Sequence, residues 1–256
     1  MRIRIVISVL VLVLVVCPHV CAAQQITVAA AADLQFAMQD IAARFEKQTG
    51  KTVRVIYGSS GNFFQQIENG APFDMFFSAN LDFPQKLGAA GLADPSSFYS
   101  YARGRIAIWV PQQSKLDLSS GLRILLDPSV KKIAIANPQH APYGQAAVAA
   151  MRKEGMYENV KDKLVLGENI SQTASFVTTG AADVGIVALS LALSANMKDK
   201  GRYVEVPANE YPPIEQACVI LSASKNKGLA EEFLAYIKTA GVADVLQRYG
   251  FDLPRR

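Results

Sequence analysis

The stretch that decides the fold is ITVAAAADLQFAMQDI, from Ile26 to Ile41. Its first half is an apolar run typical of a buried strand, and its second half repeats apolar residues at helical spacing. Asp33 lies between the halves, where a helix would begin, and Gly50 stands where it would end. A strand that turns directly into a helix points the free N–H groups of that helix at one edge of a sheet. Open α/β domains bind ligands at this edge, so the stretch predicts an α/β fold with an anion site near Asp33.

The first residues of the chain read as a segment that is removed after export. Arg2 and Arg4 precede an apolar run over residues 5–16, and small residues follow up to Ala23. A charged start, a short apolar core and a small-residue end are typical of a secretory signal, and the run is short for a membrane span. We therefore predict that residues 1–23 are a signal peptide, cleaved near Ala23, and that the mature protein is exported and soluble.

Composition argues against several classes of function. The formal net charge of +4 becomes +2 without Arg2 and Arg4, and there is no basic run, so we do not expect a nucleic-acid partner. Outside the signal, one cysteine and one histidine remain, Cys218 and His140, which allow neither an intrachain disulfide nor a usual zinc site. A Ser-His-Asp triad would have to use His140, and no G-x-S-x-G turn accompanies it. The sequence therefore argues against a hydrolase.

The next segment repeats the order of strand, small polar turn and helix. Residues 51–58, KTVRVIYG, alternate like a strand and lead into Ser59 and Ser60, the start of a second helical pattern. A hydroxyl at a helix start either caps the helix or donates to a ligand, and capping is the commoner role of one such serine. A strand over residues 74–79 and a helix over 82–90 complete a βαβαβα order, which predicts a parallel sheet.

A second unit of the same kind follows. Strands are predicted over residues 101–110, 132–136, 164–166 and 184–189. Two turns, NPQHAPYG at residues 137–144 and GENIS at residues 167–171, each lead into a helix. His140 lies in the first turn, and we expect it to fix that turn rather than to bind a ligand directly.

The end of the chain returns to the first unit. After a proline-rich crossing over residues 207–213 come a strand over 216–221 and a final helical segment. We predict an α/β fold of two domains, one formed by residues 24–104 and 211–256 and the other by residues 105–210. Two crossings between the domains make a hinge, and a cleft between hinged domains is the natural place for a ligand.

Six segments, in this order, resemble the periplasmic molybdate-binding proteins of ABC importers, the ModA type. The segments are AAADLQFAMQDIA, YGSSGNFFQQIENGAPFDMFFSAN, NPQHAPYG, GENISQT, DVGIVALS and QRYGFDL. The resemblance implies a hinged two-domain periplasmic binding protein of class II, with the ligand cleft between the domains. It also implies that the protein captures molybdate or tungstate in the periplasm and delivers it to the membrane permease of an ABC importer. On this resemblance we expect a monomer with no cofactor and no catalytic residue.

The resemblance further implies a site in which neutral hydroxyls and backbone N–H groups hold a tetrahedral oxyanion, with no direct ligand to the metal. The first contact of the family, often a serine, falls on Asp33. The second falls on Ser60, with Ser59 beside it. The second domain contributes backbone N–H groups, which match Tyr143 and Ile170.

One tyrosine of the family's site has no counterpart at its own position. Some members carry a tyrosine after the strand GIV, where this chain has Ala188. The resemblance therefore implies a missing hydroxyl, for which Tyr143 and Tyr57 are the candidate replacements.

Asp33 is the main departure from the family pattern. A carboxylate about 4 Å from a dianion costs several kcal/mol per unit charge at an effective dielectric constant near 20. We expect Asp33 to turn inward, cap its own helix and offer the ligand only its backbone N–H. Two alternatives stay open. In one, the site takes a protonated or differently shaped anion whose proton Asp33 accepts, and in the other the site has lost anion binding.

Two rival classes of function also stay open. One is an enzyme on the same bilobal fold that uses Asp33 and His140. The other is a receptor for another solute, such as an organic acid, phosphate or ferric ion. Molybdate and tungstate are nearly the same size, so the sequence does not separate them. Sulfate is smaller and would leave donors unpaired, at about 1–3 kcal/mol for each buried group.

Overall fold

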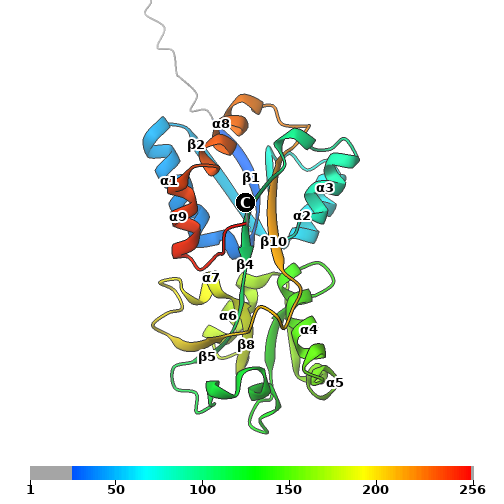
Figure 1. Ribbon diagram of the computed structural model, residues 1–256, viewed down its shortest axis with the longest axis vertical. Coiled ribbons are helices and arrows are strands. Elements are labelled where there is room, and N and C mark those ends of the chain that lie inside the picture. Colours follow the sequence, from blue (N-terminus) through cyan, green and yellow to red (C-terminus); the bar gives the residue numbers. More distant parts are fainter. Residues whose placement is uncertain (1–24, 255–256) are drawn as a thin grey trace, which may run out of the picture.

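The computed structural model describes residues 25–254, so the predicted signal peptide lies outside the described residues. Two five-stranded sheets form the centres of two α/β lobes, which lie one above the other along the long axis of the molecule (Figure 1). Within residues 25–254, no helix is long and apolar enough to cross a membrane.

The first sheet has the strand order β2-β1-β3-β10-β4. Its parallel part consists of β1 (Gln25–Ala31), β2 (Thr52–Gly58) and β3 (Met75–Ser78), as the βαβαβα pattern predicts. The other two strands, β4 (Tyr99–Gly104) and β10 (Ile214–Ile220), pair antiparallel, and β10 is also antiparallel to β3. The sheet is therefore mixed rather than purely parallel.

Helices cover both faces of this sheet (Figure 1). On one face lie α1 (Gln35–Thr49), α8 (Lys227–Ile237) and α9 (Ala240–Arg248), whose apolar side chains form one core cluster with alternate residues of β1. On the other face lie α2 (Ser60–Glu68) and α3 (Asp82–Ala89), which enclose a smaller cluster rich in phenylalanine. Successive side chains of a strand point to opposite faces, so β1 contributes to both clusters and is buried from Val28 to Ala31.

The second sheet has the order β7-β6-β8-β5-β9. The strands are β5 (Ile106–Pro111), β6 (Ile133–Ala136), β7 (Leu164–Gly167), β8 (Val184–Ala188) and β9 (Gly201–Glu205). β6 is parallel to β7 and β8, whereas β5 is antiparallel to β8 and β9. Each lobe therefore combines a parallel part, which presents its carboxyl edge, with antiparallel strands that bring the chain back.

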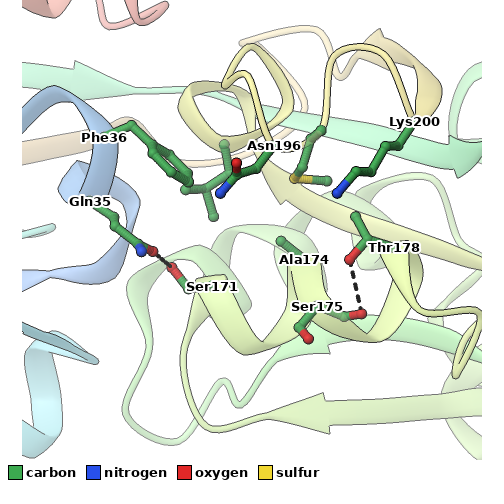
Figure 2. Close-up of a pocket in the computed structure, with 10 residues that line it drawn as sticks. Gln35, Phe36, Ser171, Ala174, Ser175, Thr178, Asn196 and Lys200 are labelled. Carbon is green, nitrogen blue, oxygen red and sulfur yellow. Dashed lines mark hydrogen bonds between the residues drawn. The ribbon is translucent and has the colours of Figure 1, made fainter.

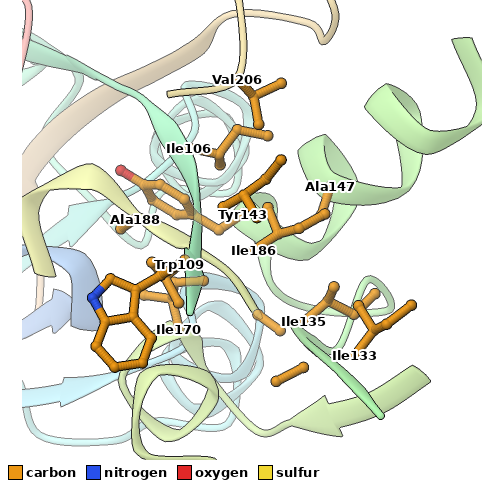
Figure 3. Close-up of a cluster of buried hydrophobic side chains, with 14 of the residues drawn as sticks. Ile106, Trp109, Ile133, Ile135, Tyr143, Ala147, Ile170, Ile186, Ala188 and Val206 are labelled. Atoms are coloured by element: carbon orange, nitrogen blue, oxygen red, sulfur yellow. The ribbon is translucent and has the colours of Figure 1, made fainter. Parts of the chain in front are cut away.

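The helices of the second lobe are α4 (Pro142–Lys153), α5 (Tyr157–Val160), α6 (Ile170–Thr178) and α7 (Leu189–Ala192). Their apolar residues and the sheet form one continuous cluster around the single tryptophan, Trp109 (Figure 3). Short 3₁₀ segments complete the chain: η1 (Ala32–Leu34), η2 (Pro95–Ser97), η3 (Leu118–Leu126) and η4 (Lys161–Lys163).

Two predictions about element boundaries were wrong. The strand predicted over residues 101–110 is two strands, β4 and β5, because the chain leaves the first sheet after Gly104 and enters the second at Ile106. The helix predicted to begin at Asp33 begins at Gln35, and the tighter turn η1 precedes it. A 3₁₀ turn is a common way to start an α-helix and does not alter the apolar stripe that the sequence displays.

Close packing between a helix start and a strand end makes Gly144 a test of the fold. A Cβ atom at this position would lie 2.0 Å from the backbone carbonyl oxygen of Ala136. We expect Gly144→Ala to lower the free energy of unfolding by about 1–3 kcal/mol, because overpacking forces the backbone to shift.

Gly228, in the first turn of α8, provides the matched control because a Cβ atom added there would have no other atom within 4 Å. Gly228→Ala should leave stability unchanged or raise it by about 0.4–1 kcal/mol. Chemical denaturation of both variants checks the pair, and equal stability of Gly144→Ala and the parent chain would contradict the packing described here.

Candidate functional site

A small cavity lies where the two lobes meet. Its lining residues are Ala31, Ala32, Asp33, Gly58, Ser59, Ser60 and Ala79 from the first lobe and Ala141, Pro142, Tyr143 and Ile170 from the second. The space inside it that the centre of a water-sized sphere can occupy has a volume of about 10 Å³. The cavity brings together all five residues that the sequence singled out as a site.

A larger and more open depression lies beside this cavity, between α1 and α6, with a volume of about 330 Å³ (Figure 2). Ser171 on α6 points toward Gln35 on α1 there, and its hydroxyl lies 3.0 Å from Gln35 Oε1. None of the predicted site residues lines this depression. We therefore take the small cavity as the candidate site.

The cavity is surrounded by the beginnings of helices. The connection from β1 passes through η1 into α1, and α2, α4 and α6 follow β2, β6 and β7. Because these strands are parallel within their sheets, their following helices start at the same edge, and the first N–H groups of a helix have no partner within it. Such N–H groups and the positive end of the helix dipole favour an anion.

Ser59 and Ser60 have different roles at the start of α2. Ser59 is the N-cap, and its Oγ accepts a hydrogen bond from the N–H of Asn62 at 3.3 Å, so it has the commoner of the two roles that the sequence allows either serine. The buried Ser60 Oγ accepts the N–H of Ala79 at 2.9 Å. Among the described residues, no hydrogen bond uses the Ser60 hydroxyl as a donor. Ser60 is therefore the serine whose O–H is available to the cavity.

Asp33 does not cap its helix, and the prediction that it would was wrong. Neither η1 nor α1 has a side-chain cap, because the N-cap position of η1 is Ala31 and Asp33 already lies inside that turn. Its Oδ2 instead accepts a hydrogen bond from the Tyr143 hydroxyl at 2.9 Å and another from Gln216 Nε2 at 2.7 Å. Its Oδ1 is buried and has no hydrogen-bond partner among the described residues.

Burial controls the protonation of this group. Asp33 is only 1% exposed, and desolvation raises the pKa of its carboxyl to about 6, although the hydrogen bonds from Gln216 and Tyr143, and then the backbone N–H groups of Asp33 and Leu34, act in the opposite direction. Burial, and then the nearby Asp33, raise the pKa of the Tyr143 phenol well above its usual value. Tyr143 therefore stays protonated and donates to Asp33.

Gln216 is a site residue that sequence reasoning missed. It is fully buried in β10, and its Oε1 accepts the hydroxyl of Tyr101 at 2.8 Å while its Nε2 donates to Asp33. The signal was present in the sequence, because an amide inside the apolar strand QACVIL must find buried partners. A chain of hydrogen bonds thus links Tyr101, Gln216, Asp33 and Tyr143 across the two lobes.

The two candidates for the missing hydroxyl do not supply it to the cavity. The hydroxyl of Tyr143 is engaged with Asp33 and lies 3.1 Å from Gln216 Nε2. Tyr57 is half-buried, packs on the core clusters and is not a lining residue. Tyr143 and Ile170 are themselves held by the core of the second lobe, so their backbone positions are well supported (Figure 3).

Several hydrogen bonds hold the lobes together around the cavity. The Ser171 hydroxyl donates to the carbonyl of Ala32 at 3.1 Å, and the Ser190 hydroxyl donates to the carbonyl of Asp33 at 2.7 Å. The N–H of Gly61 donates to the carbonyl of His140 at 2.9 Å. A Cβ atom on Gly61 would lie 2.6 Å from that carbonyl oxygen, so this approach requires glycine.

His140 connects the lobes at the edge of the site. Its Nδ1 lies 2.7 Å from Ser59 Oγ, and its Nε2 lies 3.7 Å from Glu168 Oε1, which also accepts a hydrogen bond from Asn62. The histidine is not a lining residue of the cavity. Within residues 25–254, no group of three His, Cys, Asp or Glu residues could hold a metal ion.

The comparisons with known proteins agree with this arrangement. The family described as "Bacterial extracellular solute-binding protein" matches residues 26–252. The molybdate-binding protein ModA of Azotobacter vinelandii is 39% identical over 91% of this chain and 92% of its own length. ModA of Rhodobacter capsulatus is 36% identical over 90% of this chain and 89% of its own length.

A solved structure supports the same assignment. The periplasmic molybdate-binding protein of Azotobacter vinelandii superposes with a TM-score of 0.85 at 34% identity, covering 90% of this chain and 100% of that one. The chain therefore belongs to the bacterial extracellular solute-binding proteins and, within them, to the family of the ModA proteins.

Proposed function

We propose that this protein captures molybdate or tungstate outside the cytoplasm, in the periplasm, and delivers it to the membrane permease of an ABC importer. The observation that carries the proposal is the small interlobe cavity bounded by helix starts and by the free hydroxyl of Ser60. The relatives whose names include molybdate binding support the choice of ligand.

The donors of the site are neutral. In this proposal the anion accepts the Ser60 hydroxyl and backbone N–H groups at the starts of η1, α2, α4 and α6, those of Tyr143 and Ile170 included. No lysine or arginine is among the described lining residues, so fixed dipoles replace the water shell of the anion without a counter-ion. Residues 24–104 with 211–256, and residues 105–210, would act as the two hinged domains of a monomer.

Cavity size and the available side chains argue against two of the other solutes considered, an organic acid and a ferric ion. A volume of about 10 Å³ for the centre of a water-sized sphere suits a compact inorganic anion better than an organic acid. A ferric site would need several phenolate or carboxylate ligands. The two candidates here, Asp33 and Tyr143, are hydrogen-bonded to each other.

The enzyme alternative needs a nucleophile beside a base, and Ser59 with His140 is the pair to consider. Ser59 Oγ already accepts the N–H of Asn62 as a helix cap and donates to the carbonyl of His140 at 3.2 Å. His140 does not line the cavity, so the pair presents no base to the contents of the site. These contacts support a structural role for the pair, and we retain the transport function.

The first test of the proposal is a panel of anions. We expect the mature protein to bind molybdate and tungstate at least about a hundredfold more tightly than sulfate or phosphate, a difference of about 2.7 kcal/mol. Calorimetric titration of the four anions at one pH and ionic strength checks this expectation. Equal or tighter binding of sulfate or phosphate would overturn the assignment of the ligand.

The second test compares the two serines. We expect Ser60→Ala to weaken molybdate binding by about 1.5–3 kcal/mol, because it removes a hydrogen bond to a charged ligand. Ser59→Ala is the matched control. It should lower the free energy of unfolding by about 0.5–2 kcal/mol through the lost cap and affect binding less.

Calorimetric titrations and denaturation curves of both variants separate the two effects. An unchanged affinity in a folded Ser60→Ala protein would show that another group donates to the anion.

A further inference from the structure

The carboxyl group of Asp33 is the one carboxyl among the described residues that line the cavity, and its two oxygens differ in their surroundings. Oδ2 is turned toward Tyr143 and Gln216 and accepts a hydrogen bond from each. Oδ1 is shielded from solvent and has no partner among the described residues. Oδ1 is therefore the oxygen left for the contents of the cavity.

We propose that Asp33 takes up one proton from solvent when the oxyanion binds and meets the anion as a neutral carboxylic acid, with Oδ1–H as a donor. This inference rests on the function proposed above. It means that the affinity for the anion depends on pH through Asp33. A carboxylate beside a dianion in a closed cavity would be strongly repelled, whereas a carboxylic acid adds one more neutral donor to the cage. The step is a simple association: carboxylate, proton and dianion combine, and no other bond changes.

The hydrogen bonds determine which oxygen carries the proton. A proton on Oδ2 would displace the hydroxyl of Tyr143 or the amide of Gln216, and a displaced buried donor is costly. A proton on Oδ1 displaces no side-chain donor, because neither Tyr143 nor Gln216 is bonded to that oxygen. The two donors therefore hold Oδ2 as an acceptor and leave Oδ1–H to face the anion.

The pKa of Asp33 is already close to neutral pH before any ligand binds. Burial raises the pKa of its carboxyl to about 6, so about one molecule in ten is protonated at pH 7. A bound dianion favours the neutral form and raises this pKa further. The affinity for the anion is therefore highest at pH values below the pKa of Asp33 in the ligand-free protein. It falls as the pH rises above that pKa.

The other titratable groups around Asp33 do not compete for this role. Tyr143 on α4 and Tyr101 on β4 have pKa values raised well above the usual value of a phenol, chiefly by burial, and Cys218 on β10 is buried with its pKa also raised. The helices α6 and α7, which pack against η1, carry no titratable side chain, and the charged residues of α1 begin only at Asp40. The strand β2, which also packs against η1, carries the exposed Arg54 and Tyr57, whose pKa burial raises to about 12. Among the described residues, no lysine, arginine or histidine forms an ion pair with Asp33.

Calorimetric titration of molybdate in buffers that differ in ionisation enthalpy measures the protons taken up per anion. We expect the parent protein to take up close to one proton per anion near pH 8, with affinity falling by up to about tenfold per pH unit above 6. Asp33→Asn presents a neutral amide donor in the same place. It should take up no proton, bind with little dependence on pH and exceed the parent affinity at pH 8.

Two further variants make the result unambiguous. His140→Gln removes the histidine at the edge of the site, and proton uptake should persist in it whatever its affinity. Asp33→Ser, which also lacks the carboxyl, replaces Asp33→Asn if the latter does not fold.

The outcomes separate the two proposals. Molybdate binding without proton uptake, or uptake that persists in Asp33→Asn, would overturn the role of Asp33 and leave the transport function standing. Absence of binding of both molybdate and tungstate at every pH would refute both.

Discussion

The structure depends on the direction of its parallel strands. In each lobe these strands end at the edge that faces the other lobe, and each is followed by a turn and a helix. The starts of several helices therefore line one cavity, although their residues lie far apart in the sequence. An anion can be held there by backbone groups that every residue type supplies, and few side chains are needed.

Much of this arrangement could be predicted from the sequence because it is local. The apolar stripe of α1, the cap formed by Ser59 and the turns before α4 and α6 all depend on residues within a few positions of each other. The same local reasoning misplaced the strand over residues 101–110. The periodicity of apolar residues predicts a strand but does not show where the chain passes from one sheet to the other.

The surroundings of Asp33 could not be predicted in the same way. Its partners Tyr143 and Gln216 are 110 and 183 residues away in sequence. A short carboxylate near a helix start is most often a cap. Asp33 is an exception because its carboxylate accepts hydrogen bonds from two buried donors on other elements. The buried amide of Gln216 was the available clue, since a polar residue in an apolar strand has to be satisfied by something.

The contacts between the lobes affect the ligand-free protein as well as the protein with a bound anion. The hydrogen bonds of Gly61 with His140, of Ser171 with Ala32 and of Ser190 with Asp33 join protein groups directly and do not require an anion. If the lobes are hinged as proposed, part of the free energy of closure is therefore independent of the ligand, and some empty molecules would be closed at equilibrium. That closed, empty population cannot accept an anion, so it lowers the apparent affinity in proportion to its share. In the proposed transport function it would also present the permease with the shape of a loaded protein, which limits how far shape alone can report that an anion is bound.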